Sequence, residues 1–354
     1  MKLNIIKTTR ILIMLGIAVF VFCMSSYRSA PLGKVETDTI RVVLPVNFPK
    51  PVYNFDQNPI TKAKFELGKA LFYGAVLSSD HSISCSSCHQ ASAAFANLNT
   101  AVSKGVRDCL GDRNAPPLFN LAWQKEFMLD GRIKNILDVP TNALTSPCEM
   151  NNQPDSIIKM LKNDSVFPAL FEQAFGSNSI KTENVLTALT QFTVMIISAD
   201  TKYDRYIRKE MGADFTADEQ RGYILFKEKC SSCHKEPLFT DGSYRNNGLD
   251  DLSKDRGRDS ITHLISDRGR FRVPTLRNIE ITRPYMHDGR FGSLKQVLQH
   301  YASNVRNHAN LDPILNKTGS RGIPLSIVEQ SQLIAFLKTL TDIHLINDRR
   351  FINF

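Results

Sequence analysis

Residues 85–89 read Cys-Ser-Ser-Cys-His, and residues 230–234 repeat the same five residues. A C-x-x-C-H pentapeptide is the attachment signal for c-type haem, in which both thiols bond to the haem and the histidine ligates the iron. A single copy would also fit a redox-active cysteine pair or half of a zinc site. Because there are two copies, we predict two covalent haems, with these attachment and proximal residues: Cys85, Cys88 and His89, and Cys230, Cys233 and His234.

The sequence before each pentapeptide is repeated as well. Gly-Lys-Ala-Leu-Phe at residues 68–72 precedes the first copy, and Gly-Tyr-Ile-Leu-Phe at residues 222–226 precedes the second. Two copies of one small module imply two similar domains.

The periodic segments are mostly helical. Thr216 and Ser326 each begin a capping box, and residues 183–199 form a long, mostly apolar helix candidate. No run of alternating strands with hairpin turns is found. Long loops, at residues 90–120 and 236–285, suit a chain that wraps large cofactors. The predicted fold is therefore all-α, with two cytochrome c-like domains.

The chain begins with the pattern of an export signal. Three basic residues precede an apolar stretch at 11–23, which is too short for a stable membrane span. We expect periplasmic export, with the segment either cleaved or kept as an anchor. The expected divisions are residues 1–26 (signal peptide), 27–60 (extended lead-in), 61–205 (N-terminal haem domain) and 206–354 (C-terminal haem domain).

Composition excludes several classes of protein. Hydrophobic residues make up 42% and charged residues 22% of the 354 residues, which excludes a disordered chain and a multi-span membrane protein. The formal net charge is +9, but basic residues are interspersed with acidic ones, so we expect no nucleic-acid partner. The oligomeric state is left open, with a homodimer as one option.

Two cysteines remain after haem attachment is considered. Of the seven cysteines, one lies in the signal and four in the pentapeptides, which leaves Cys109 and Cys148. In an oxidising compartment such a pair is a candidate disulfide. Two separate thiols are the alternative, because spacing alone does not show pairing.

Further motifs carry a resemblance to a known family. They are Gly-Asp-Arg-Asn-Ala-Pro at 111–116, Asp-Gly-Arg at 130–132, Cys-Glu-Met at 148–150, Val-Pro-Thr-Leu-Arg-Asn at 273–278 and Pro-Tyr-Met-His-Asp-Gly at 284–289. From about residue 60 to residue 342, the chain resembles the bacterial di-haem cytochrome c peroxidases and the related MauG proteins. The resemblance implies that the N-terminal haem is the peroxide site and that the C-terminal haem receives electrons.

The resemblance also assigns roles around the first haem. Glu149 matches the family's acid–base residue, and a carboxylate over an open haem face suits the transfer of a proton between peroxide oxygens. Many relatives block this face with a histidine from the loop before Arg113, but residues 90–113 contain no histidine. We therefore expect a five-coordinate first haem that needs no reductive activation.

For the second haem, the position that matches the sixth ligand is Tyr301, where the peroxidases carry methionine and MauG-type proteins carry tyrosine. A phenolate ligand favours ferric over ferrous iron. Met286 and His300 are rival ligands, and an ordinary core tyrosine is a further alternative. The family also binds one calcium ion between its domains, which implies the oxygen ligands Asn114, Thr282 and Pro284.

Two positions depart from the family. Leu129 replaces the tryptophan between the haems, and Val139 replaces a distal glutamine, while the only tryptophan is Trp123. Phe127 and Tyr285 offer other aromatic rings for electron transfer. The predicted activity is reduction of hydrogen peroxide to water with electrons from a small cytochrome or similar donor. The alternatives are MauG-type oxidation of a partner protein and a non-enzymatic di-haem electron carrier.

Overall fold

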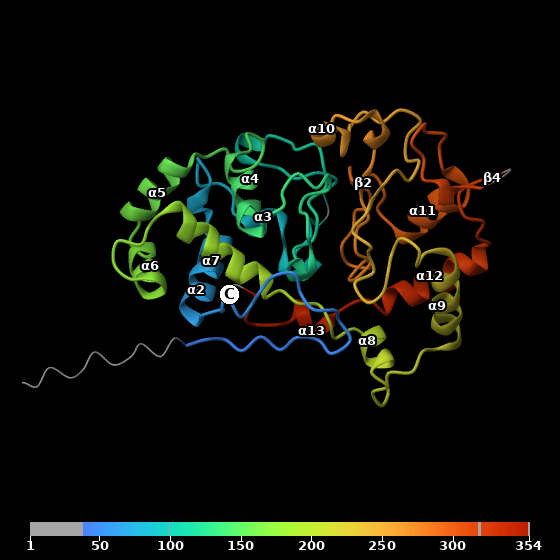
Figure 1. Cartoon of the computed structure of the whole chain (residues 1–354), viewed down its shortest axis with the longest axis horizontal. Coiled ribbons are helices and arrows are strands. Elements are labelled where there is room, and N and C mark those ends of the chain that lie inside the picture. The colour runs from blue at the N-terminus through green and yellow to red at the C-terminus, as the bar shows by residue number, and fades with distance from the viewer. Residues whose placement is uncertain (1–37, 99, 318–319, 353–354) are drawn as a thin grey trace, which may run out of the picture. The chain divides into compact units, whose positions relative to one another are not determined.

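A computed structural model describes residues 38–98, 100–317 and 320–352 of the chain. The chain divides into two units, residues 1–38 and 39–354, and every labelled element of Figure 1 belongs to the second. The predicted signal peptide, at residues 1–26, lies outside the described residues. None of the helices that are described is long and apolar enough to cross a membrane.

The described residues are rich in helices. The α-helices before residue 200 are α2 (Lys62–Tyr73), α3 (Cys85–Cys88), α4 (Val139–Thr145), α5 (Pro154–Asn163), α6 (Phe167–Phe175) and α7 (Thr182–Val194). Those after it are α8 (Lys202–Ile207), α9 (Ala217–Lys229), α10 (Asp259–Thr262), α11 (Leu294–Gln299), α12 (Ile327–Lys338) and α13 (Ile343–Ile346). A π-helix, η7 (His300–Asn304), continues α11.

Short 3₁₀ helices and strands fill parts of the loops. The 3₁₀ helices are Ala75–Leu77, Ala91–Ala93, Val106–Asp108, Leu121–Trp123, Ile136–Asp138, Ile265–Asp267 and Pro313–Leu315. The strands are β1 (Tyr244–Arg245), β2 (Phe271–Arg272), β3 (Asn316–Lys317) and β4 (Ser320–Arg321), paired antiparallel as β1–β2 and β3–β4. With only two-residue strands among the described residues, the expected helical class is confirmed.

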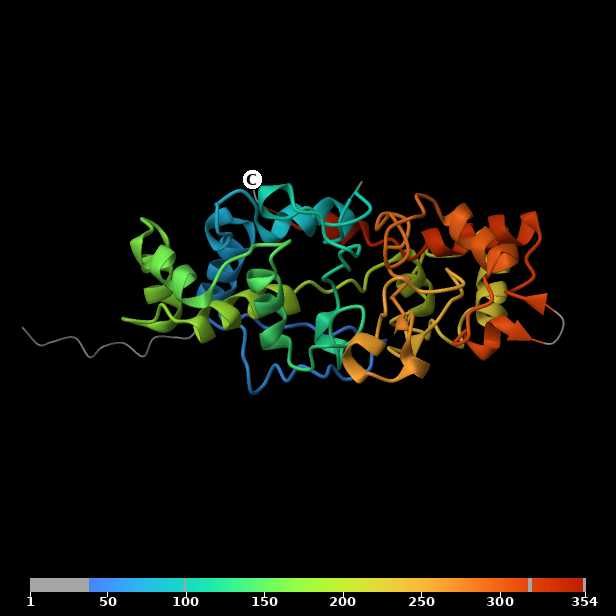
Figure 2. The same cartoon turned by 90° about the horizontal axis from the view of Figure 1, so that it is seen from above.

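The repeated glycine explains how each half is built. A Cβ added at Gly68 on α2 would lie 2.0 Å from the Ala188 carbonyl oxygen on α7. A Cβ added at Gly222 on α9 would lie 1.9 Å from the Gln332 carbonyl oxygen on α12. Both glycines thus allow two helix backbones to meet closely, and the pairs α2–α7 and α9–α12 are visible in Figures 1 and 2.

The helix signals of the sequence are confirmed at two of three sites. Thr216 and Ser326 form complete capping boxes at the starts of α9 and α12. The helix expected over residues 183–199 is shorter, because α7 ends at Val194. The chain turns there because the Ile196 carbonyl oxygen accepts a hydrogen bond from the Asn120 main chain (2.8 Å), in place of a helical donor.

Two large hydrophobic clusters, with a small third one of Val305, Leu311 and Leu315, form the core of these residues. The first centres on phenylalanines of α2 and α7, including Phe72 and Phe192, whose rings are 5.0 Å apart. The second centres on Phe226 of α9 and Phe336 of α12, with rings 5.1 Å apart. The chain then returns, because Leu345 and Phe351 at its C-terminal end are buried in the first cluster.

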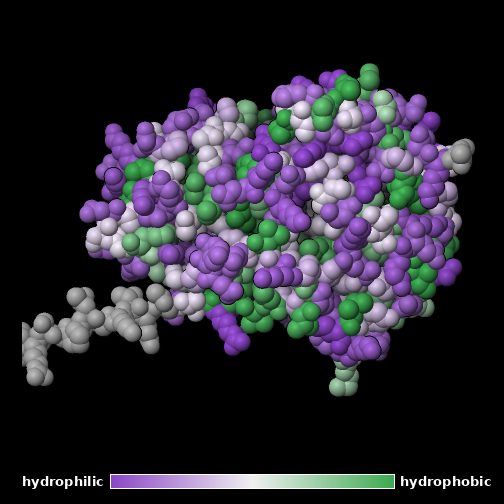
Figure 3. All heavy atoms as spheres, viewed as in Figure 1, coloured by the Kyte–Doolittle hydropathy of each residue, from purple (hydrophilic) through white to green (hydrophobic). Residues whose placement is uncertain are grey.

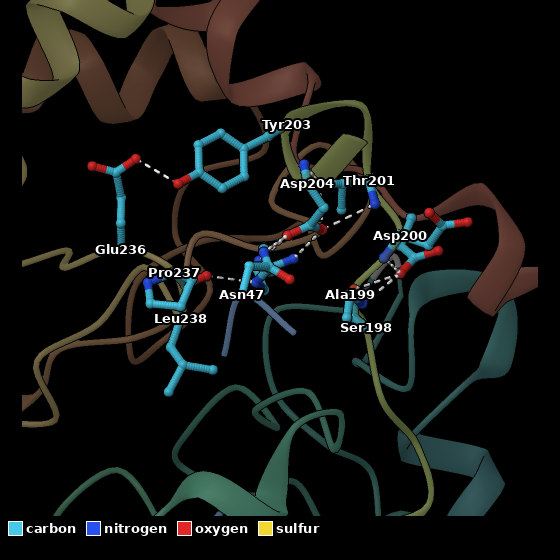
Figure 4. Close-up of polar contacts among 12 residues, drawn as sticks. Asn47, Ser198, Ala199, Asp200, Thr201, Tyr203, Asp204, Glu236, Pro237 and Leu238 are labelled. Carbon is cyan, nitrogen blue, oxygen red and sulfur yellow. Dashed lines mark hydrogen bonds and ion pairs between the residues drawn. The ribbon is translucent and has the colours of Figure 1, made fainter. Parts of the chain in front are cut away.

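A buried ion pair joins distant parts of the chain (Figure 4). Arg277 donates hydrogen bonds of 2.8 and 2.7 Å to the carboxylate of Asp204, and both side chains are fully buried. Asn47 of the lead-in donates to the same carboxylate at 2.9 Å. Burial alone would raise the pKa of Asp204, but the hydrogen bonds and charge of Arg277 hold it below its usual value. The lead-in segment is thereby fixed to the second half of the chain.

Candidate active site

The first C-x-x-C-H motif lies on a single helical turn. α3 begins after Ser84, which forms a capping box with Ser87, and His89 caps the C-terminal end of the turn. The Nδ1–H of His89 donates to the carbonyl oxygen of Phe95 at 3.1 Å, so Nε2 is left to ligate a metal. Burial lowers the pKa of His89 to about 4, which keeps the imidazole neutral, as an iron ligand requires.

The second motif has the same arrangement. Cys230 caps the end of α9, and His234 places Nδ1 at 3.1 Å from the carbonyl oxygen of Pro274 and 3.3 Å from that of Phe239. Burial lowers the pKa of His234 as well. In each motif one carbonyl partner belongs to a phenylalanine with positive φ, Phe95 at 62° and Phe239 at 54°, where the loop turns back onto the histidine. The two halves therefore orient their histidines in the same way.

Glu149 lies beside the first motif. Burial raises the pKa of Glu149, and a hydrogen bond with Ser146 and the charge of Arg132 oppose the rise. The charge of Glu149 acts on the neighbouring thiol of Cys88. Burial raises the pKa of Cys88, and the charge of Glu149 adds to the rise. The structure thus brings the predicted acid–base residue to the motif of the predicted peroxide site.

The segment before Arg113 packs against Glu149. Cys109 and Cys148 are joined by a disulfide in the structure. A Cβ added at Gly105 would lie 2.2 Å from the Cys148 carbonyl oxygen, so the two backbones are too close for any side chain at residue 105. Both ends of this contact flank the predicted peroxide site.

Tyr301 lies beside the second motif. Burial raises its pKa to about 12, a side-chain hydrogen bond with Asn247 opposes the rise, and the sulfur atoms of Cys230 and Cys233 add to it. Its place in the π-helix η7 is notable because such single turns occur often at functional sites. The phenol is therefore near the residues that are expected to hold the second haem.

The two rival ligands have other partners. The His300 Nε2 donates to the Asn247 carbonyl oxygen at 3.0 Å, and the Met286 sulfur accepts from the Asn247 amide at 3.3 Å. Tyr301, His300 and Met286 thus meet at Asn247. Asn247 has no predicted role from the sequence, where it stands in the stretch Asn-Asn-Gly-Leu at residues 246–249.

Comparison with known proteins identifies the family. The family model for di-haem cytochrome c peroxidase matches residues 62–212. The chain is 35% identical over 299 residues to the methylamine utilization protein MauG of Methylorubrum extorquens, with 82% of each protein covered. It is 32% identical over 281 residues to the cytochrome c551 peroxidase of Nitrosomonas europaea, with 78% of this chain and 79% of that protein covered. The chain belongs to the di-haem cytochrome c peroxidase family.

Solved structures agree with this membership. A MauG-like protein associated with microbial copper homeostasis superimposes with a TM-score of 0.81 at 30% identity, covering 88% of this chain and 99% of that one. The dihaem peroxidase BthA of Burkholderia thailandensis shares the fold, with a TM-score of 0.68 at 23% identity, covering 86% of this chain and 96% of that one. Membership makes the protein an oxidoreductase of the peroxidase class, and a di-haem family implies two c-type haems.

The calcium ligands implied by the family stay a prediction. The Asn114 main chain donates to the His287 carbonyl oxygen at 2.7 Å, which brings Asn114 to the segment that follows Pro284. Thr282, the third expected ligand, donates its own N–H to Asn278. Within the described ranges, no group of three or more His, Cys, Asp or Glu side chains could hold a metal ion. The expected calcium ligands are of another kind, an amide and two carbonyl oxygens.

The two departures from the family lie in ordinary surroundings. The Leu129 carbonyl oxygen accepts a 2.8 Å hydrogen bond from the main chain of Arg272, and Val139 is the first residue of α4. Trp123 is buried in the first cluster, and its indole N–H donates to the Pro49 carbonyl oxygen at 2.7 Å. The indole therefore packs on the lead-in segment.

Arg113 links two motifs that are separate in the sequence. Its guanidinium donates to Asp130 at 2.6 Å and to Asp255 at 2.6 and 2.8 Å. The guanidinium also lies over the ring of Phe271, 5.4 Å from its centroid. The Phe271 ring in turn stacks on His287, with ring centroids 4.1 Å apart. The arginine of the Arg-Asn-x-Pro motif and the aspartate of the Asp-Gly-Arg motif are thus ion-pair partners.

Proposed function

We propose that the protein is a periplasmic enzyme that reduces hydrogen peroxide to water with electrons from a small cytochrome c or a similar donor protein. The observation that carries the proposal is the half-buried Glu149 carboxylate beside the first C-x-x-C-H motif. Burial raises the pKa of Glu149, which brings it nearer to neutral pH, where an acid–base group works best.

The residues fit two c-type haems. All four motif cysteines are free thiols, and each motif histidine has its Nδ1 held by a carbonyl oxygen, as expected for a metal-bound imidazole. Cys85, Cys88 and His89 would hold one haem, and Cys230, Cys233, His234 and Tyr301 the other. When bound, the first haem supplies an iron centre that reduces peroxide, and the second supplies an electron-transfer centre.

Glu149 moves the proton that the reaction needs. Its carboxylate accepts the proton from one peroxide oxygen and donates it to the other oxygen, which leaves as water when the O–O bond breaks. Two electrons from the donor protein and two protons from the solvent then reduce the remaining oxygen to a second water. The Glu149 main chain is held on both sides, because its N–H donates to Ser146 (3.1 Å) and its carbonyl oxygen accepts from Val106 (2.9 Å). The disulfide between Cys109 and Cys148 holds the same segment a third time.

Oxidation of a partner protein is the second candidate function. It is favoured by Tyr301, which stands where MauG-type proteins carry tyrosine, and by the 35% identity to a MauG protein. It is disfavoured by Leu129, because a leucine gives no aromatic ring at that point between the haem motifs. A non-enzymatic electron carrier would make no use of the half-buried carboxylate of Glu149.

Steady-state peroxide consumption by the haem-loaded protein, with a reduced small cytochrome c as donor, tests the proposal. Glu149→Gln keeps the shape but removes the base, and we expect kcat to fall by about 10²–10⁴-fold with haem content unchanged. Glu172→Gln, an exposed position on α6, is the matched control. Wild-type turnover in Glu149→Gln, or no peroxide consumption by the wild type, would contradict the proposal. Consumption that needs a partner protein instead of cytochrome c would favour the second candidate.

A further inference from the structure

Arg272 is a half-buried cation without an anionic partner. Its Nη1 donates to the Gln124 side-chain oxygen, while its buried Nε has no hydrogen-bond partner. Arg272 forms no ion pair in the described part of the chain. An arginine stays charged in proteins, so a guanidinium withdrawn from water is costly unless an anion lies beside it.

The other arginines show how unusual this is. In the ranges that the structure describes, every other arginine that is not exposed pairs with a carboxylate: Arg113, Arg205, Arg208, Arg245, Arg258, Arg268, Arg270 and Arg277. Arg277 is the instructive contrast, because its two hydrogen bonds to Asp204 satisfy a guanidinium that is fully buried. Arg272 lacks the equivalent partner.

The acidic side chain whose charge acts on Arg272, Glu126, already has other partners. Glu126 accepts a 2.7 Å hydrogen bond from the Tyr244 hydroxyl and lies 3.4 Å from Arg258. Its charge acts on Arg272 only from a distance that forms no ion pair. The missing anion is therefore not supplied by the described protein residues.

Arg272 lies between the second haem motif and a segment of the first half of the chain. It ends β2 (Figure 1), and Pro274, two residues later, provides a carbonyl oxygen to His234 of the second motif. Its own N–H donates to Leu129, and its side chain donates to Gln124, both of the first half. An anion at this guanidinium would be close to the second motif and would face the first half of the chain.

We propose that Arg272 binds a propionate carboxylate of the second haem. A c-type haem carries two propionates, which remain as carboxylates after the vinyl groups have bonded to cysteine. The planar guanidinium fits a carboxylate with two parallel hydrogen bonds, for which Nε and a terminal nitrogen are the usual donors. The bound cation favours the reduced haem, because it stabilises the added electron electrostatically. Arg272 is therefore a residue that positions the haem and raises its potential.

Redox titration of the haem-loaded protein, followed optically and by EPR, tests this inference. We expect Arg272→Gln to lower the reduction equilibrium constant of the second haem about tenfold, which corresponds to 59 mV for one electron. Arg272→Lys keeps the charge and should retain most of the potential. Arg270→Gln is the matched control. It removes a cation that is two residues from Arg272 but is paired with Asp267, and it should leave the potential unchanged.

Three results would overturn the inference. They are an unchanged potential for both haems in Arg272→Gln, an equal shift in Arg270→Gln, and a shift confined to the first haem, which would assign the propionate to that haem instead. Resonance Raman spectra add a second readout, since the propionate bending band of the second haem should move in Arg272→Gln. If Arg272→Gln fails to fold, the propionate bending band of the second haem is measured in Arg272→Lys instead. A band that does not move in Arg272→Lys contradicts the inference. The inference rests on the proposed haem attachment, and peroxide consumption measured on the same samples tests the proposed activity separately.

Discussion

The main-chain N–H of Val106 donates a 2.9 Å hydrogen bond to the carbonyl oxygen of Glu149. This bond ties the loop before Arg113 to the candidate acid–base residue. The disulfide between Cys109 and Cys148 ties the same two segments together. Because Glu149 has two such supports, its position depends on the loop as much as on its own turn after α4.

Removal of the disulfide should destabilise the protein. Cys109 and Cys148 are 39 residues apart, and on the chain-entropy model a loop of that length is worth roughly 4 kcal/mol. We expect Cys109→Ser with Cys148→Ser to lower the free energy of unfolding by up to about that amount, and to slow the reaction with peroxide. Denaturant unfolding measures the first effect. Mass spectrometry of non-reduced peptides is the direct check, and alkylatable thiols at both positions in the wild type would refute the bridge.

The reaction with peroxide should depend on pH through Glu149. Burial raises the pKa of Glu149, and the carboxylate is the form that accepts the peroxide proton. As the pH falls through this raised pKa, the rate should fall, and this should happen at a higher pH than for an exposed glutamate. Stopped-flow rates against pH measure the effect. Glu149→Gln should lose this acidic limb, whereas Glu172→Gln should keep it.

The oxidised protein should react with peroxide without prior reduction. Residues 90–113 contain no histidine that could occupy the sixth position of the first haem. We expect EPR of the as-isolated protein to show a high-spin first haem, and peroxide to change that signal at once. A fully low-spin protein that reacts only after half-reduction would show that another residue blocks the site.

Tyr301 should be a ligand of the second haem. Its phenol is held near Cys230 and Cys233, and an anionic oxygen ligand favours ferric iron. We expect Tyr301→Phe to change the optical and EPR spectra of the second haem, and Tyr301→Met to raise its potential. Tyr206→Phe, which removes a hydroxyl that donates to Gln220, serves as the control and should leave both unchanged. An unaltered second-haem spectrum in Tyr301→Phe would exclude the assignment.

The close helix pair of the second half should not tolerate a side chain at Gly222. A Cβ there would lie 1.9 Å from the Gln332 carbonyl oxygen, so α9 and α12 would have to move apart. Overpacking of this kind costs about 1–3 kcal/mol or more. We expect Gly222→Ala to lower the unfolding temperature. Gly292→Ala, whose nearest atom would lie at 3.8 Å, should not do so, and equal midpoints for both variants would refute the packing argument.

Local signals in the sequence predicted the local structure well. The capping residues Thr216 and Ser326 predicted the starts of α9 and α12. The two haem domains that the paired pentapeptides indicate stay a prediction. The end of α7 was not predictable in this way, because it depends on Asn120, which is far away in the sequence. A helix continues or stops according to such partners, and periodicity does not reveal them.

Contacts between distant segments could not be predicted from the sequence. In the sequence, Arg277 appears only as part of a motif. Nothing in the sequence indicates that Asp204 would be its ion-pair partner in the core. Asn247 and Arg272 were also missed, since a single amide or guanidinium gives no periodic signal. Hydrophobic and hydrophilic residues are also mixed on the face shown in Figure 3, so hydropathy does not indicate which residues contact one another.

The return of the C-terminal end has a consequence for biosynthesis. The ring of Phe351 is packed among Phe65, Phe95 and Phe192, and the Tyr73 hydroxyl donates to its carbonyl oxygen. A ribosome releases the chain from its N-terminal end, so the helices of the first half emerge long before their last core residue. That half therefore completes its packing only after Phe351 has been synthesised. A nascent chain that stops before residue 351 has an incomplete first core.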